Sequence, residues 1–367
     1  MRDDIRMTVG VDLGDRFSNY CVIAEDGEVV RRTRISTTKK AFSREFPAEP
    51  KVRIALEVGT HSPWVSRLLQ DAGHEVIVAD PHRLALISKN HKKSDESDAE
   101  LLARLARTDL SLISPIEHRS ATAQADLTVI RARDTLVAAR TKLINMVRCQ
   151  VKSNGARMKT CSAESFHKEA VKQIPEAIRL ALEPVVGQIK SMTDTINDYD
   201  RQVNKLASEK YKATELLCQV SGVAALTALT FVLTIDRPER FAKSRDVGAF
   251  LGLVPAQHAS GAGDPQMRIT KRGDGLMRRL LVGSAHYILG PFGHHSPSDL
   301  RDWGLSLAAR GGKNAKKRAV IAVARKLAVL LHRLWTTGQA YDPRRRAADA
   351  NARNSSAQKQ AANPCAP

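Results

Sequence analysis

The chain has 367 residues, enough for two or three domains that each bury a core. Hydrophobic residues make up 43%, which is typical of a globular protein, and aromatic residues only 4%, which favours aliphatic, largely helical cores. Lys and Arg outnumber Asp and Glu by 58 to 39, a formal net charge of +19. This excess favours a polyanionic partner, most commonly a phosphate backbone.

The five cysteines are scattered and include no C-x-x-C pair, which excludes a zinc ribbon or a disulfide framework and indicates a reducing compartment. No apolar run approaches the roughly 20 residues of a membrane span. No signal-peptide pattern follows the charged N-terminus. We therefore expect a cytoplasmic, nucleoid-associated protein that has no membrane partner.

Residues 1–120 predict a mixed α/β sheet. Strands are expected at 7–14, 18–25, 28–35, 52–57 and 75–79, and helices near 38–46, at 61–72 and after Pro81. Three strands in succession, followed by strands that alternate with helices, indicate a sheet of the ribonuclease H type.

Residues 121–213 predict two long helices. The second has apolar residues at alternating spacings of four and three over four heptads, which is typical of a coiled coil. Its expected seam consists of Ile178, Leu182, Val185, Ile189, Met192, Ile196, Tyr199, Val203 and Leu206. The partner is either the helix at 121–151 of the same chain or another subunit, which would make a dimer or a dimer of dimers.

Residues 214–340 predict a mainly helical domain, with helices at 276–289 and 315–336 and a loop-rich stretch at 253–275. Its start resembles a helix-hairpin-helix around Gly222, although Ala224 replaces the second glycine of that motif. Residues 341–367 are rich in arginine and poor in apolar residues, so we expect a disordered basic tail.

Four acidic residues, Asp12, Glu57, Asp95 and Asp98, form the first candidate site. Asp12 and Glu57 each end a predicted strand, so adjacent strands would bring both carboxylates to one edge of the sheet. Asp95 and Asp98 are three apart and share a helix face if the helix includes both. Four converging carboxylates would need cations, and two Mg²⁺ ions about 4 Å apart could act on a phosphodiester; Mn²⁺ would substitute.

Each acid also has a purely structural explanation. Asp95 and Asp98 could oppose the positive end of a helix dipole, and Ser97 with Glu100 fits a capping box. The turn after Asp12 also resembles the start of the actin-like ATPase and sugar kinase fold. That class is disfavoured because the sequence has neither a P-loop nor a second phosphate turn.

Ser260 precedes a glycine in a basic loop and forms the second candidate site; His258 is a weaker candidate for a base. Positive surroundings bind phosphate and activate a hydroxyl. From the physics alone, however, a turn serine inside a basic DNA-contacting loop is the better explanation of the pattern. The cations expected to contact nucleic acid are Arg268, Lys271, Arg272, Arg278, Arg279, Lys313, Lys316, Lys317 and Arg318.

These motifs together resemble the insertion-sequence-one-ten family of DEDD transposases. The matching stretches are Gly10-Val-Asp12-Leu-Gly, Ala55-Leu-Glu57-Val-Gly-Thr, Lys93-Ser-Asp95-Glu-Ser-Asp98-Ala and Leu251-Gly-Leu-Val-Pro, followed by Ser260-Gly and Ile269-Thr-Lys-Arg-Gly. The resemblance covers roughly residues 7 to 335 in order.

The resemblance implies a RuvC-like N-terminal domain that holds metal on Asp12, Glu57, Asp95 and Asp98, and a nucleophilic serine at Ser260. It also implies a structured non-coding guide RNA and both donor and target DNA as partners. We expect a recombinase that forms a phosphoserine intermediate, with a site that different subunits could share. The alternatives are a metal-only nuclease that uses water as the nucleophile and a non-catalytic nucleic-acid-binding protein.

Overall fold

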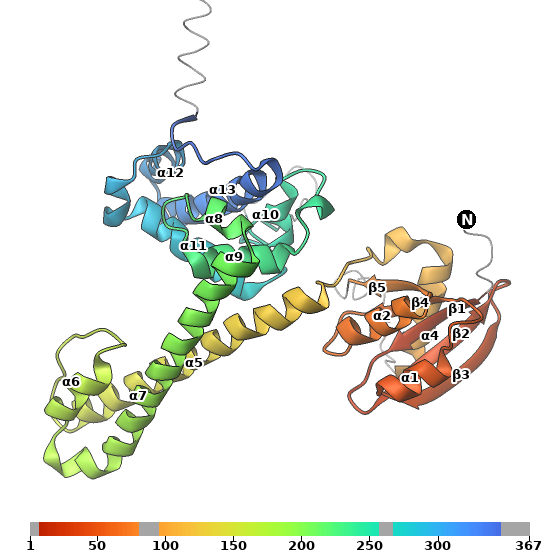
Figure 1. Ribbon diagram of the computed structural model, residues 1–367, viewed down its shortest axis with the longest axis horizontal. Helices are drawn as coiled ribbons and strands as arrows, with labels where there is room; N and C mark the ends of the chain where they lie inside the picture. Colours follow the sequence, from red (N-terminus) through yellow and green to blue (C-terminus); the bar gives the residue numbers. More distant parts are fainter. Residues whose placement is uncertain (1–6, 81–94, 257–266, 346–367) are drawn as a thin grey trace, which may run out of the picture. The chain divides into compact units, whose positions relative to one another are not determined.

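The computed structural model describes residues 7–80, 95–256 and 267–345 (Figure 1). The chain divides into two compact units, Met1–Arg119 and Ser120–Pro367. The first unit is built on a β-sheet, and the second consists of helices. Within the described ranges, no helix combines the length and the apolar character needed to cross a membrane.

The sheet of the first unit has five strands in the order β3-β2-β1-β4-β5. These strands are β1 (Met7–Asp12), β2 (Phe17–Ala24), β3 (Val29–Ser36), β4 (Arg53–Glu57) and β5 (Glu75–Ala79). The first three form an antiparallel meander, whereas β4 pairs parallel with β1 and β5 pairs parallel with β4. The predicted α/β class with a mixed sheet is therefore confirmed, and so is the mostly helical remainder of the chain.

Helices cover both faces of this sheet (Figure 1). Val11 and Leu56 point to the face that packs against α1 (Lys39–Glu45) and α2 (Ser62–Asp71), in a core that includes Phe42 and Val65. Ala55 points to the opposite face, where it packs against Leu102 of α4 (Asp95–Thr108). The alternation of side chains along each strand therefore assigns Asp12 and Glu57 to the face that α4 covers.

Gly10 sets the distance between β1 and α4. A Cβ added to Gly10 would lie 2.0 Å from the carbonyl oxygen of Ala99 and 2.4 Å from the amide nitrogen of Ala103. Both atoms belong to the helix backbone, which cannot move aside as a flexible side chain can. Only glycine therefore allows α4 to lie this close to the strand that ends in Asp12.

In the second unit, α5 (Ala121–Ser153) and α7 (Glu176–Lys205) pack side by side (Figure 1). The Nε of Arg133 lies 2.6 Å from Oδ1 of Asp200, and the Nη1 of Arg140 lies 3.2 Å from Oγ1 of Thr193. A step of seven residues forward in α5 matches seven backward in α7, so the helices run antiparallel. The second long helix therefore has a partner within its own chain.

The packed seam of α7 differs in part from the predicted one. Leu182, Ile189, Ile196 and Val203 are buried as predicted. Val185 and Met192 are only half-buried, whereas the neighbouring Val186 and Thr193 are buried. The Thr193 hydroxyl donates to the carbonyl of Ile189 at 2.8 Å and accepts from the buried Arg140. A spacing rule based on apolar residues misses a threonine that is buried because its hydroxyl has partners.

A short helix, α6 (Phe166–Gln173), packs on the hairpin of α5 and α7. The later helices form a separate apolar core. They are α8 (Ala213–Leu217), α9 (Ala225–Ile235), α10 (Asp246–Phe250), α11 (Gly275–Leu289), α12 (Asp299–Ala309) and α13 (Ala315–Thr337). Gly222, between α8 and α9, has a φ of +83°, and an added Cβ would lie 3.2 Å from the carbonyl oxygen of Ser284 in α11. Close packing against α11 explains this glycine without a bound phosphate.

The chain after α13 turns back onto the helices. Tyr341 packs against the core, the amide of Asp299 donates to the carbonyl of Pro343 at 2.8 Å, and Arg344 forms an ion pair with Asp302. Residues 341–345 were expected to begin the disordered tail, but Tyr341 gives this segment an apolar anchor. Residues 346–367 lie outside the described residues.

Replacing Gly10 with alanine should destabilise the first unit by about 1–3 kcal/mol, because the added methyl group overpacks the contact with α4. Hydrogen exchange of the α4 amides should become faster in the variant. Gly59→Ala is the matched control, since nothing lies within 4 Å of a Cβ added there. Equal exchange rates in Gly10→Ala and the native chain would contradict this role of Gly10.

Candidate functional site

Asp12 and Glu57 lie at the carboxyl ends of neighbouring parallel strands. The register pairs Gly10 with Ala55 and Val11 with Leu56, so the next pair along the two strands is Asp12 and Glu57. Paired residues of parallel strands point to the same face of the sheet. The structure therefore brings these two acids to one edge of the sheet, which we call the acidic edge. They lie on the face covered by α4, and both are half-buried.

The direction of α4 brings its first turn toward the same edge. Arg53, at the start of β4, donates to the carbonyl of Ala106 near the end of α4 at 3.2 Å. Gly10, further along the sheet, approaches Ala99. The helix therefore runs opposite to β1 and β4, and its N-terminal turn lies toward the strand ends that carry Asp12 and Glu57.

Asp95 and Asp98 both belong to this first turn. The described helix begins at Asp95, so the two acids lie three apart on one helix. Asp98 is half-buried and precedes Leu102, which packs against Ala55 on the sheet, by four residues. Positions i and i+4 share a helix face, so Asp98 lies on the face of α4 that is turned to the sheet. The side chain of Asp95 lies outside what the structure describes.

The donor set has the chemistry of a site for a hard divalent cation, because carboxylate oxygens are the ligands that such ions prefer. In the described part of the chain, no three His, Cys, Asp or Glu side chains are close enough together to hold a metal. Asp12, Glu57 and Asp98 therefore do not form such a group by themselves. A site at this edge requires Asp95 or a closer approach of the three.

A histidine at the same edge was not singled out by the sequence. Nε2 of His61, directly before α2, lies 3.5 Å from Oδ1 of Asp15 in the turn after β1. The indole nitrogen of Trp64 donates to Nδ1 of His61 at 3.1 Å, which leaves the proton of the neutral ring on Nε2. The pair joins the two turns that follow Asp12 and Glu57. Only tertiary structure brings the two turns together.

Two short backbone segments on either side of the second candidate site pair with each other, and we call this pair the stem. Ser260 and His258 lie outside the described residues. On either side of them, the amide of Ala256 donates to Arg268 and the amide of Thr270 donates to Val254, each at 2.9 Å. These two backbone hydrogen bonds close the base of the segment that carries Ser260.

Glycine holds this stem against the start of α11. Gly252 has a φ of +66°, and an added Cβ would lie 2.2 Å from the carbonyl oxygen and 2.4 Å from the amide nitrogen of Arg272. Gly273 has a φ of +74° and approaches the carbonyl of Phe250 in the same way. The glycines of the two sequence motifs on either side of Ser260 therefore pack against each other's backbone.

The structure separates the predicted cations of this region into two groups. Arg278 donates to the backbone carbonyls of Leu251, Arg272 and Gly273, and Arg279 pairs with Asp134 of α5 at 2.7 Å. Arg278 therefore stabilises the loop, and the charge of Arg279 is already balanced. The cations that are exposed and form no ion pair within the described residues are Arg268, Lys271 and Arg272.

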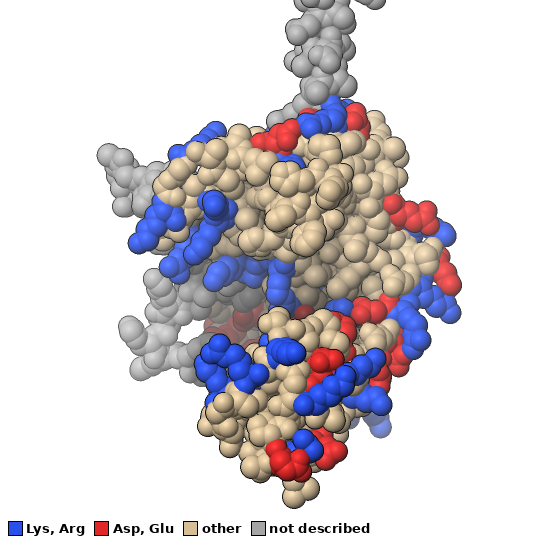
Figure 2. Space-filling model, turned by 90° about the vertical axis from the view of Figure 1, so that its left-hand side faces the viewer, with Lys and Arg blue, Asp and Glu red and all other residues tan. Residues whose placement is uncertain are grey.

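A further group of cations lies where α13 begins. Lys313, Lys316, Lys317 and Arg318 are all exposed, and the first turn of the helix has no acidic residue. Positive side chains there oppose the helix dipole, so they do not stabilise the helix. This arrangement favours binding of an anion. On the face drawn in Figure 2, Lys and Arg side chains form separate groups, and a broad area carries no charged residue.

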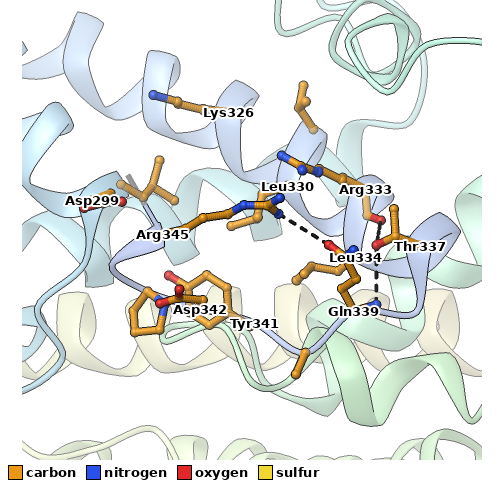
Figure 3. A pocket seen from close by; sticks show the side chains of 14 residues that line it. Asp299, Lys326, Leu330, Arg333, Leu334, Thr337, Gln339, Tyr341, Asp342 and Arg345 are labelled. Carbon is orange, nitrogen blue, oxygen red and sulfur yellow. Dashed lines mark hydrogen bonds between the residues drawn. The ribbon is translucent and has the colours of Figure 1, made fainter. Parts of the chain in front are cut away.

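The segment after α13 forms a pocket of about 340 Å³ with that helix and Asp299 (Figure 3). Arg345 donates to Oε1 of Gln339 across it at 3.4 Å, and Asp342 lies on its rim (Figure 3). The lining combines Lys326, Arg333 and Arg345 with the two acids. This mixture of charges does not favour a phosphate over other ligands.

Comparison with known proteins identifies the class. A transposase family model of the DEDD type matches residues 9–154, and a model described as transposase of the IS116/IS110/IS902 family matches residues 214–290. The first match contains Asp12, Glu57, Asp95 and Asp98, whose order spells DEDD, and the second contains Ser260.

Curated relatives match over nearly the whole chain. The transposase for insertion sequence element IS1111A of Coxiella burnetii is 28% identical over 350 residues, which cover 92% of each protein. The transposase for IS1328 of Yersinia enterocolitica is 25% identical, covering 91% of this chain and 98% of the relative. A probable family 20 transposase of Pseudomonas aeruginosa is 26% identical, with the same coverage of 91% and 98%.

The fold, the acidic edge and these matches define a transposase, an enzyme that cleaves and recombines DNA. The chain belongs to the IS110 family of insertion-sequence transposases. The predicted family is therefore confirmed. The DEDD designation of the family also indicates dependence on a divalent metal.

Gly252→Ala should open the stem that closes the segment of Ser260, because the added methyl group meets backbone atoms and the left-handed conformation disfavours alanine. The expected destabilisation is about 1–3 kcal/mol, with faster hydrogen exchange at the amides of Ala256 and Thr270. Gly283→Ala in α11 is the control, because nothing lies within 4 Å of its Cβ. Unchanged exchange at both stem amides would rule out this role of Gly252.

Proposed function

We propose that this transposase cleaves and exchanges DNA strands through a covalent phosphoserine intermediate and that its acidic edge positions the scissile phosphate. The observation that carries the proposal is the placement of Asp12 and Glu57 at the ends of adjacent parallel strands, with the first turn of α4 directed toward them. Acids from three separate elements are thus directed toward one edge of the sheet, an arrangement that the stability of any single helix or strand does not require.

Asp12, Glu57, Asp95 and Asp98 would hold the divalent metal, for which Mg²⁺ is the expected ion and Mn²⁺ a substitute. When bound, the metal would neutralise charge on the phosphodiester and on the departing oxygen. By determining where the metal is held, the acids would determine where the scissile phosphate lies at the carboxyl edge of the sheet. The described side chains do not form a complete metal group, so the proposal requires the carboxylate of Asp95 as well.

In the proposed step, the Oγ of Ser260 attacks the phosphorus. The bond between phosphorus and the 3′ oxygen breaks as the bond to Oγ forms. The serine loses its proton, and the departing 3′ oxygen gains one, so the cut strand ends in a free 3′ hydroxyl. The energy of the phosphodiester is retained in the phosphoserine bond, and strand exchange therefore needs no ATP.

The DNA would lie on the two groups of exposed cations described above, at the stem and at the start of α13. We also propose a structured non-coding RNA, encoded by the element itself, as a guide that selects donor and target DNA. The basic excess of the chain favours polyanionic partners, and an RNA is one of that class. Recovery of the transposase from cells with a single RNA that maps beside its gene would test this partner.

The covalent step predicts an adduct on DNA. Full-length protein incubated with Mg²⁺ and labelled DNA that carries the ends of the element, together with any guide RNA, should yield a protein–DNA complex that survives denaturation. Ser260→Ala should abolish this complex because it removes the nucleophile. Asp98→Asn should lower its yield at least about 100-fold, since it removes a carboxylate that would hold the divalent metal.

The second candidate function is a metal-only nuclease with water as the nucleophile. The acidic edge favours it, because all four acids belong to the first unit. Cleavage without an adduct, retained in Ser260→Ala, would support this alternative. If no DNA cleavage is detected and nucleic-acid binding is unchanged in both Asp98→Asn and Asp95→Asn, both enzymatic mechanisms are contradicted and a protein that only binds nucleic acid is favoured.

The cationic surface predicts a steep dependence on salt. Between 50 and 200 mM salt, affinity for mixed-sequence duplex DNA should fall by about 10³-fold or more if six or more phosphates are contacted. The double substitution Lys316→Gln and Lys317→Gln should reduce the slope of log affinity against log salt by about 2. Arg279→Gln should change it less, because Arg279 is already paired with Asp134. A flat response of the native chain would contradict a charge-driven interface.

A further inference from the structure

A row of polar residues crosses the sheet in line with the acidic edge. The register pairs Asp12 with Asn19 of β2, and Asn19 with Arg34 of β3. Because paired residues share a face, Arg34 and Asn19 lie on the same face as Asp12 and Glu57. Neighbouring strands are about 4.8 Å apart, so Arg34 lies roughly 10 Å from Asp12 across the sheet. The family resemblance assigns no role to Arg34 or Asn19.

The arginines of β3 differ in their partners. Arg31 points to the opposite face and pairs with Glu45 at 2.9 Å. Arg32 forms an ion pair with Glu100 of α4, and its hydrogen bond holds the pKa of the Glu100 carboxyl below its usual value. Arg34 is exposed and, among the residues that the structure describes, has no carboxylate within ion-pair distance. Of these three arginines, Arg34 is therefore the one whose charge is available to bind an external anion.

The ring of Phe17 holds the Arg34 guanidinium in place. The guanidinium carbon lies 4.5 Å from the centre of the Phe17 ring, and the ring is 47% exposed. A ring against the flat face of a guanidinium limits its rotation, while the N–H donors at its edge stay available. Phosphate oxygens bind to that edge, often through two parallel hydrogen bonds.

A small hollow lies beside this guanidinium. Its volume is about 150 Å³, and it is lined by Asn19, Tyr20, Arg32, Thr33 and Arg34. Asn19 supplies an amide that can donate to a phosphate oxygen, and Arg32 adds positive potential despite its partner Glu100. The hollow therefore combines a neutral donor with a cation that has no ion pair in the described part of the chain, and it has space for a phosphate-sized group.

We propose that Arg34 and Asn19 bind a backbone phosphate of the DNA strand whose scissile phosphate lies at the acidic edge. This inference rests on the proposed function of Asp12 and Glu57. A separation of roughly 10 Å is short enough for both contacts to lie within a few nucleotides of each other on one strand, because each nucleotide step rises about 3.4 Å along the duplex axis and also advances around it. Arg34 would thus fix the register of the strand a few nucleotides from the cleaved bond. Arg34 is a positioning residue in this proposal, because it does not touch the reacting atoms.

The test measures binding of full-length protein to a fluorescent mixed-sequence DNA duplex over a range of salt concentrations. Arg34→Ala should lower affinity about 5- to 20-fold and reduce the slope of log affinity against log salt by about 1, because one phosphate contact is lost. Arg34→Lys should keep the slope, since it keeps the charge. Asn19→Ala should lower affinity without changing the slope, because asparagine is neutral.

Arg31→Ala is the matched control. It removes the same charge from the same strand but on the opposite face, where Arg31 already pairs with Glu45. Its affinity should stay within twofold of the native value. The thermal unfolding midpoint of Arg34→Ala should be unchanged, because the side chain is exposed.

The outcomes separate this inference from the proposed function. If Arg34→Ala binds DNA with native affinity and slope while Asp98→Asn abolishes the covalent adduct, the phosphate contact is wrong and the proposed chemistry stands. If Arg34→Ala and Arg31→Ala lower the slope equally, the effect is one of net charge and the inference is also wrong. A reduced slope in Arg34→Ala alone supports the contact, whatever the adduct assay shows.

Discussion

The contact between Gly10 and the backbone of α4 is the constraint on which the acidic edge depends. It fixes how close the helix lies to β1, at 2.0 Å between a hypothetical Cβ and the carbonyl oxygen of Ala99. From that contact, the opposite directions of helix and strand carry the first turn of α4 toward the strand ends. Any side chain at Gly10 would lift the helix and separate the acids of α4 from Asp12 and Glu57.

Charge has different roles in different parts of this basic protein. Arg278 and Arg279 are engaged by backbone carbonyls and by Asp134, so they hold α11 to the loop and to α5. Exposed lysines at the start of α13 oppose the helix dipole and favour a bound anion. On β3, Arg31 pairs with Glu45, whereas Arg34 has no carboxylate partner among the residues that the structure describes. The net charge of +19 predicts a polyanionic partner but does not show which cations contact it.

Glycines constrain the backbone next to the acidic edge and next to the segment that carries Ser260, although for different reasons. Gly10 has no unusual conformation and is required only by the close approach of a helix. Gly252 has a φ of +66° and also lies against backbone atoms, so conformation and space both require glycine there. In each case a rigid backbone contact fixes the segment next to a candidate catalytic residue, which is how a site attains defined geometry.

The sequence by itself determined the strands, the long helices and the acids at strand ends, because burial imposes a period of two or 3.6 on neighbouring residues. It also determined the family, through motifs that need no three-dimensional information. Tertiary structure alone decided that β1 lies beside β4, that α7 packs on α5 with Thr193 in the seam, and that Arg34 lies in line with Asp12. The physical reason is that strand order and register arise from contacts between distant residues, which local periodicity does not encode.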